Sequence, residues 1–132
     1  MLLFNLTIKE AHEGLKNKQF SCKELVQSCL QRIEKVEDKL NSFISLNKEE
    51  AIIKAGENDD LIAKEKESIF QKKPLLGIPV AIKDLFSTHG LRTTAGSKII
   101  QNYIPPFDAT VVSKLKTAGV VIIGKTNQDA WG

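Results

Sequence analysis

The first forty residues alternate apolar and polar positions with the period of a helix. Thr7 followed by Glu10, and Ser21 followed by Glu24, are capping boxes, which predict helices near residues 8 to 18 and 22 to 40. The second helix carries an apolar stripe, spaced alternately by four and three residues, that consists of Cys22, Val26, Cys29, Ile33, Val36 and Leu40. Core packing is therefore the preferred interpretation of both cysteines, because their spacing suits neither a disulfide nor a zinc site.

A short apolar run and two charged stretches follow this helix. Ser42 to Leu46 predicts a short strand. Residues 48 to 56 and 59 to 70 have a helical but highly charged pattern, and the polar cluster from Gly56 to Asp59 predicts a break between them. We interpret both helices as solvated surface.

The last part of the chain changes to compact apolar runs separated by glycine and proline. Residues 78 to 83 predict a buried strand, and residues 120 to 123 predict a second one. Between the two strands, Asp108 is predicted to cap a helix over residues 109 to 117, which Gly119 ends. This helix leads directly into the second strand, as in half of a crossover unit.

These elements predict an α/β fold. N-terminal helices are followed by the start of a mixed, mainly parallel sheet that is covered by helices. We expect an N-terminal helical segment over residues 1–73 and the first part of an α/β core over residues 74–132.

Composition agrees with one domain that buries a modest core. Of the 132 residues, 42% are hydrophobic and 27% are charged. The net charge of +3 is too small to indicate nucleic-acid or membrane binding by itself. The start from Met1 to Leu6 is too short for a signal-peptide core, and no apolar run reaches the length of a membrane span. A cytoplasmic location is therefore expected.

One motif favours a different class of protein. Gly119 to Thr126 matches the phosphate-loop pattern, which would indicate nucleotide binding. That loop must follow a strand and turn its backbone amides around phosphates, whereas β-branched apolar residues fill the variable positions here and favour an extended strand. We therefore interpret Lys125 and Thr126 as the exit of a strand.

Lys83 is the most informative polar residue, because it ends an otherwise apolar strand. A buried ammonium is costly, so such a lysine either reaches solvent or has a function. Asp84 could orient Lys83, but a carboxylate there would favour the protonated lysine, so a turn or cap role is preferred. His12 and His89 lack partners at metal-ligand or triad spacing, and both are expected at the surface or in loops.

The loop after Lys83 is a candidate binding region, since ligand contacts in α/β sheets gather where strands end. Its polar or glycine positions are Arg92, Thr93, Thr94, Gly96 and Ser97. Gly96 and Ser97 border a pocket in one interpretation and form a glycine-rich turn in the other, and the sequence leaves both open.

Four segments of the chain resemble the amidase signature family in the same order. They are Pro74 to Asp84, Thr93 to Ser97, Pro105 to Val112 and Ala118 to Asn127. Residues 74 to 129 match densely, while the opening helices match in pattern rather than in specific residues. Within the family, the resemblance is greatest to the glutamine-hydrolysing subunits of glutamyl-tRNA(Gln) amidotransferases.

The resemblance implies a mechanism for Lys83. The family uses a serine nucleophile, a second serine held by a cis peptide bond, and a lysine base, and Lys83 matches that lysine. A serine hydroxyl is a poor nucleophile until a base takes its proton, and a lysine can do so only when it is neutral. The apolar run from Ile78 to Ile82 is expected to supply the desolvation that favours the neutral form. The bridging serine would relay the proton.

The chain departs from the family pattern at its end. The family's Gly-Lys-Thr-Asn segment leads into a loop that carries both catalytic serines, whereas this chain stops at Gly132. We therefore expect these 132 residues alone to be inactive towards amides. Exposed strand edges and apolar faces are also expected in this piece of the fold.

The resemblance also implies partners. The complete enzyme would hydrolyse glutamine and pass ammonia to a partner subunit that activates glutamyl-tRNA(Gln) with ATP and magnesium, while a small third subunit braces the assembly. This chain is expected to hold no cofactor or metal and to meet tRNA only indirectly. Two alternatives stay open, namely a stand-alone amidase acting on another amide and a non-catalytic fragment that binds partner subunits.

Overall fold

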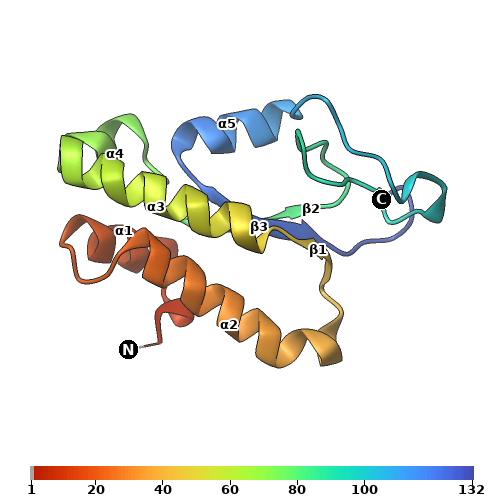
Figure 1. Ribbon diagram of the computed structural model, residues 1–132, viewed down its shortest axis with the longest axis horizontal. Helices are drawn as coiled ribbons and strands as arrows, with labels where there is room; N and C mark the ends of the chain where they lie inside the picture. The colour runs from red at the N-terminus through yellow and green to blue at the C-terminus, as the bar shows by residue number, and fades with distance from the viewer. Residues whose placement is uncertain (1) are drawn as a thin grey trace.

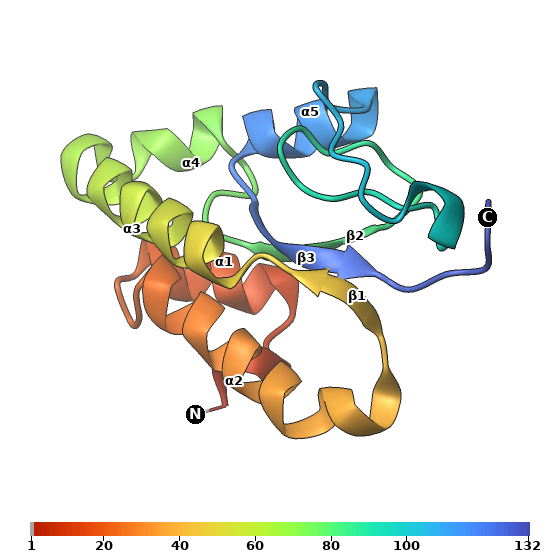
Figure 2. The same cartoon turned by 45° about the vertical axis from the view of Figure 1, so that its right-hand side comes forward.

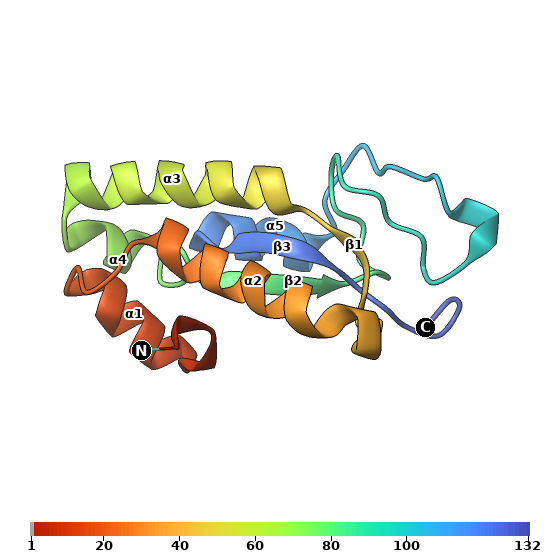
Figure 3. The ribbon, with the colours of Figure 1, turned by 60° about the horizontal axis from the view of Figure 1, so that its bottom comes forward.

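The computed structural model describes residues 2–132 as helices packed around a small sheet (Figure 1). In chain order the elements are η1 Leu3–Asn5, α1 Ile8–Lys16, α2 Cys22–Leu40, β1 Phe43–Leu46, α3 Lys48–Glu65, α4 Ser68–Lys72, β2 Pro79–Lys83, η2 Lys98–Ile100, α5 Thr110–Ala118 and β3 Val121–Thr126. The helices α2 and α5 lie on opposite sides of the sheet (Figure 2), and α3 packs against α2 (Figure 3). The α/β fold predicted from the sequence is confirmed.

The first two helices begin where their capping boxes predict. The Thr7 hydroxyl accepts from the Glu10 amide at 3.2 Å, and the Ser21 hydroxyl accepts from the Glu24 amide at 3.1 Å. Each glutamate carboxylate accepts in return from the backbone amide of the cap residue. Both cysteines are free thiols on α2, and Cys22 is completely buried, so the core interpretation is confirmed for Cys22.

The predicted break in the charged helical region is wrong. The helix α3 continues from Lys48 to Glu65, through Gly56 and Asn58. Asn58 is buried and its amide donates to the Gly119 carbonyl at 3.2 Å. The neighbouring Asp59 carboxylate accepts from the Cys22 and Lys23 amides at 2.7 and 3.1 Å, which satisfies two donors at the start of α2. These distant contacts outweigh the local preference for a turn.

The sheet is mixed, as predicted. Its strand order is β1-β3-β2, with β1 antiparallel and β2 parallel to the central strand β3. The connection from β2 to β3 contains α5, which ends at Gly119 with a φ of +96° before β3 begins at Val121. The stretch from Gly119 to Thr126 is therefore a helix end and a strand, and it does not form the loop that phosphate binding requires.

The predicted cap of α5 is also wrong. Ala109 occupies the N-cap position and makes no side-chain cap bond. The Asp108 carboxylate instead accepts from the His89 amide at 2.8 Å and from the Lys116 ammonium at 2.8 Å. The Asp108 carboxylate therefore binds the charged Lys116 side chain in the last turn of α5 and does not cap the first turn of that helix.

Two clusters of buried apolar residues hold the layers together. The larger cluster joins the first four α-helices to one face of the sheet and includes Val121 and Ile123 of β3. The smaller cluster consists of Ile82, Val112, Val120 and Ile122, and it seats α5 on the other face. The division of the chain at residue 73 stays a prediction. Among residues 2–132, the helices are all too short or too polar to cross a membrane.

Candidate functional site

Lys83 is the last residue of the parallel strand β2, and an irregular loop follows it. Its side chain is exposed, as is that of Ala81, whereas Ile82 between them is buried. Successive side chains of a strand point to opposite faces, so only the Ile82 face meets the core. The expectation that the apolar strand desolvates Lys83 is therefore wrong for the part of the chain that the structure describes.

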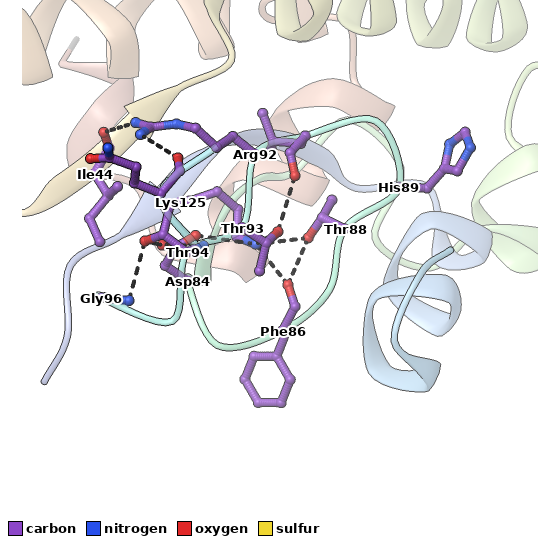
Figure 4. Close-up of polar contacts among 12 residues, drawn as sticks. Ile44, Asp84, Phe86, Thr88, His89, Arg92, Thr93, Thr94, Gly96 and Lys125 are labelled. Carbon is purple, nitrogen blue, oxygen red and sulfur yellow. Dashed lines mark hydrogen bonds and ion pairs between the residues drawn. The ribbon is translucent and has the colours of Figure 1, made fainter. Parts of the chain in front are cut away.

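A buried polar cluster lies directly beside the end of this strand (Figure 4). Among residues 2–132, Asp84 and Lys125 are the only charged residues that are buried, and neither side chain is exposed at all. The Lys125 ammonium lies 3.6 Å from the Asp84 carboxylate. It also donates to the Phe86 carbonyl at 2.7 Å and to the Thr93 and Thr88 hydroxyls at 2.8 and 3.2 Å.

The contacts of Lys125 favour its charged form. The Thr88 and Thr93 hydroxyls each donate their own hydrogen to a backbone carbonyl, at 3.1 and 3.0 Å. They can only accept from Lys125, which therefore uses all of the donors that an ammonium carries. Burial lowers the pKa of Lys125, and the Asp84 carboxylate opposes that shift. The site is thus built for a charged lysine that is held by oxygen atoms.

Asp84 holds the turn that the sequence predicts at this point. One carboxylate oxygen accepts from the backbone amide of Thr94 at 3.0 Å and from its hydroxyl. The other oxygen has no hydrogen-bond partner among the described residues and faces Lys125. The backbone of Asp84 is bonded on both sides, from its amide to the Thr126 carbonyl at 3.1 Å and from the Ala95 amide to its carbonyl at 3.0 Å.

The other candidate residues of the loop make structural contacts, either within the loop or with β1. The Arg92 guanidinium donates to the carbonyls of Ile44 and Gln101 at 3.0 and 3.2 Å, which ties the loop to β1. The Ser97 hydroxyl accepts from the Ile99 amide and caps η2. Gly96 has a φ of +67°, and a Cβ there would lie 2.9 Å from the Gln128 carbonyl oxygen. Among the alternatives for Gly96, the structure favours the glycine-requiring turn.

The two histidines have different surroundings, and His89 lines a cleft that Thr88 of the buried cluster also lines. His12 packs edge-on against Phe70, with ring centroids 5.0 Å apart. His89 is exposed and lines a cleft of about 520 Å³ between the start of α3, the loop at residues 88–91 and α5. Within residues 2–132, no three histidine, cysteine or acidic side chains gather as a metal site would require.

The sequence points to Lys83 but misses the role of Lys125, whose place after a β-branched run predicts only the exit of a strand. A signal is present, since Asp84 and Lys125 each follow an apolar run that predicts a buried strand. Opposite charges at the ends of two buried strands can pair if the strands are parallel neighbours. That condition is set by the sheet topology and cannot be read from either segment alone.

Comparison with known proteins gives consistent matches. The sequence profile of the Amidase family matches residues 24–132. The chain is 50% identical over 131 residues to the A subunit of the glutamyl-tRNA(Gln) amidotransferase of Geobacter metallireducens, and 46% identical to that of Geobacillus thermodenitrificans. Each match covers 99% of this chain and 26% of the relative, so the chain spans about a quarter of the relatives' length.

Solved structures show the same fold. A peptide amidase from Stenotrophomonas maltophilia superimposes with a TM-score of 0.87 at 30% identity, over 96% of this chain and 26% of that one. A bacterial aryl acylamidase of the amidase signature family superimposes with a TM-score of 0.88 at 25% identity, over 98% of this chain and 26% of that one. The arrangement of helices around the sheet is therefore common to proteins that differ widely in sequence.

Proposed function

Because the chain belongs to the amidase family, we propose that it forms part of the glutamine-hydrolysing subunit of a glutamyl-tRNA(Gln) amidotransferase, with Lys83 as the catalytic base. One observation carries the choice within the family. Identity is 46–50% to amidotransferase A subunits over nearly the whole chain, as in the Geobacter metallireducens protein, whereas it is 30% to the peptide amidase and 25% to the aryl acylamidase.

The proposed chemistry assigns one step to this chain. Neutral Lys83 takes the proton of the nucleophilic serine through the bridging serine, and the serine oxygen attacks the side-chain carbonyl of glutamine. The carbon–nitrogen bond breaks as the proton held by Lys83 returns through the bridging serine to the leaving nitrogen. Ammonia leaves and an acyl-serine remains, which water then hydrolyses to glutamate and the free serine. By the resemblance, both serines lie after the Gly124 to Asn127 segment in the family's order.

The exposure of the Lys83 side chain is compatible with its proposed role as the catalytic base. A base must reach its relay, and the exposed Lys83 side chain leaves β2 on the face opposite the buried Ile82. Desolvation then has to come from groups that pack over Lys83 in the active enzyme, because the strand itself does not supply it. We propose that the 132 residues alone are inactive because Lys83 is not desolvated in them and because they do not include the two catalytic serines.

The proposal extends to partners by the same resemblance. Ammonia passes to a second subunit that activates glutamyl-tRNA(Gln) with ATP and magnesium, and a small third subunit braces the assembly. This chain holds no cofactor in the proposal and meets tRNA through the other subunits.

A second candidate is a stand-alone amidase that acts on another amide. The solved structures that match include a peptide amidase and an aryl acylamidase, with TM-scores of 0.87 and 0.88. Strand β2 with Lys83 at its end is expected in either kind of enzyme, so the fold does not separate the two candidates. The level of sequence identity favours the amidotransferase.

Ammonia release tests the proposal. A chimera would carry residues 2–132 in place of the matching segment of the Geobacter metallireducens protein, with its partner subunits present. We expect glutaminase activity in the chimera and a loss of about 10²–10⁴-fold in kcat for Lys83→Ala, because a general base contributes about that much. Lys98→Ala, which changes an exposed lysine of η2, is the matched control and should retain activity.

The other outcomes separate the alternatives. Activity of the isolated 132-residue chain would contradict the serine-dependent mechanism. A chimera that hydrolyses other amides but leaves glutamine intact would favour the stand-alone amidase. A folded chimera without amidase activity would favour a non-catalytic role in binding partner subunits.

A further inference from the structure

Lys125 reaches the loop side of the sheet because of an irregularity in strand pairing. Val121 and Ile123 of β3 belong to the larger core cluster, and regular alternation would turn Lys125 towards the same face. The pairing of β2 with β3 shifts its register between Val80 and Ala81, so that Lys125 lies opposite Ile82. Ile82 belongs to the smaller cluster on the other face. The bulge therefore re-aims the lysine towards the loop that follows Lys83.

The lysine binds both ends of that loop. Its ammonium donates to Phe86 and Thr88 near the start of residues 84–97 and to Thr93 towards the end. The Asp84 carboxylate bridges the same two regions through Thr94. We call this set of contacts the Asp84–Lys125 clamp, because the two buried charges hold the loop closed against β3.

A short bonded path connects the clamp to Lys83. The Phe86 carbonyl accepts from Lys125 at 2.7 Å, and the Phe86 amide donates to the Lys83 carbonyl at 3.1 Å. Asp84, the next residue after Lys83, is fixed by β3 on one side and by Ala95 on the other. The backbone that directs the Lys83 side chain is thus restrained by groups that depend on the clamp.

Lys125 has no capacity left for chemistry of its own. Its side chain is completely buried, and its donors are all engaged with oxygen atoms of the loop. A buried pair of charges is also an expensive way to stabilise a fold, since apolar residues of similar volume often serve equally well. A geometric task is therefore the better explanation for its presence beside Lys83.

We propose that Lys125, paired with Asp84, is a positioning residue that fixes the loop after β2 and thereby the direction in which Lys83 leaves the strand. The claim that Lys125 and Asp84 fix the loop can be tested on this chain by itself. The link to catalysis rests on the proposed function of Lys83, and the two parts are tested by different measurements.

The first measurement is amide hydrogen exchange in the 132-residue chain. Lys125→Met keeps the length of the side chain and removes its charge and donors, and Asp84→Asn removes the opposite charge. In both variants we expect exchange at Phe86, Thr94 and Ala95 to quicken by about tenfold or more, since breaking a buried charged bond costs at least that factor. Exchange in α1 and α2 should not change, nor should any site in the Lys98→Met control.

The second measurement is glutaminase activity in the chimera. A displacement of about 1 Å costs about 100-fold in rate, so Lys125→Met and Asp84→Asn should lower kcat by a factor of that order while KM for glutamine stays near its original value. If Lys125 acts only through Lys83, adding Lys125→Met to Lys83→Ala should reduce the residual rate no further. A purely structural residue would reduce it in both backgrounds.

The outcomes separate the two parts. Unchanged exchange in the loop would overturn the clamp. Faster exchange with unchanged kcat would overturn the positioning role while leaving the proposed function intact, provided that Lys83→Ala is inactive. Full activity of Lys83→Ala would overturn the proposed function and, with it, the link from Lys125 to catalysis. If Lys125→Met fails to fold, the Asp84→Asn/Lys125→Met pair, which buries no lone charge, supplies the same comparisons.

Discussion

At the scale of single residues, charge is used in two different settings. Asp84 and Lys125 pair where water is excluded, whereas Asp108 and Lys116 pair at the surface, with 20% and 39% of their side chains exposed. The surface pair joins the loop at His89 to the last turn of α5. Burial raises the pKa of Asp108, but the bonds from Lys116 and the His89 amide outweigh it and leave that pKa below its usual range.

This shift predicts a dependence of stability on pH. A carboxyl group whose pKa is lowered by folding stabilises the protein above the unfolded value, and the contribution disappears as the pH falls through the folded value. We expect Asp108→Asn to lower the free energy of unfolding by about 1 kcal/mol at pH 7, and the difference from the original chain to shrink below about pH 4.

Urea unfolding at a series of pH values measures that difference. Asp60→Asn, at an exposed position of α3, is the control and should show no comparable dependence. A difference that persists unchanged at about pH 2.5, well below the usual carboxyl pKa, would show that the charge of Asp108 is not the stabilising feature.

At the scale of elements, Gly119 lies where α3, α5 and β3 meet the segment that leads into β2. It ends α5, its carbonyl accepts from Asn58 of α3 and from the Gly77 amide before β2, and β3 begins shortly after it. A Cβ at this position would lie 2.9 Å from the Leu76 Cα atom, and the φ of +96° is unfavourable for other residues. Glycine is therefore required at position 119 both by the left-handed backbone conformation and by the close approach of the Leu76 backbone.

Two glycine substitutions should have opposite effects. We expect Gly119→Ala to lower the free energy of unfolding by about 2 kcal/mol or more, because it combines a left-handed conformation with a clash against backbone. Gly56→Ala, within α3 and with no atom within 4 Å of the added Cβ, should raise it by about 1 kcal/mol. Chemical denaturation measures both. Equal effects would show that helix propensity alone governs these positions.

At the scale of the whole molecule, the second half of the chain exposes many large apolar side chains. They include Leu85, Phe86, Ile99, Tyr103, Ile104, Phe107, Val111 and Trp131. Folded domains seldom leave so much apolar surface in water unless another surface covers it. This agrees with the expectation of exposed apolar faces, and with the finding that the chain spans about a quarter of its relatives' length.

We expect the isolated chain to self-associate and to bind a hydrophobic dye. Replacing Ile104 and Phe107 by serine should weaken both effects, because these side chains are 58% and 55% exposed. The matched control replaces Leu40 and Ile53 on α2 and α3, which are 63% and 57% exposed. Sedimentation velocity and dye fluorescence measure the result. An equal effect of the two double variants would mean that no particular surface drives association.

The sequence by itself determined the local elements and the family. Two capping boxes predicted the starts of α1 and α2, apolar runs predicted β1, β2 and β3, and ordered motifs around Lys83 indicated the family. Each of these signals is contained in a few neighbouring residues, where hydrogen bonds and alternation act directly. The exclusion of a phosphate loop at Gly119 also followed from the β-branched residues beside it.

Only the tertiary structure decided where the charged groups lie. The continuity of α3, the partners of Asp108, the exposure of Lys83 and the burial of Lys125 all depend on residues far apart in the chain. Asn58 bonds a carbonyl 61 positions away, and Lys125 bonds a hydroxyl 32 positions away. Such contacts exist only after the strands have paired in one register, and a single bulge turns Lys125 to the other face of the sheet.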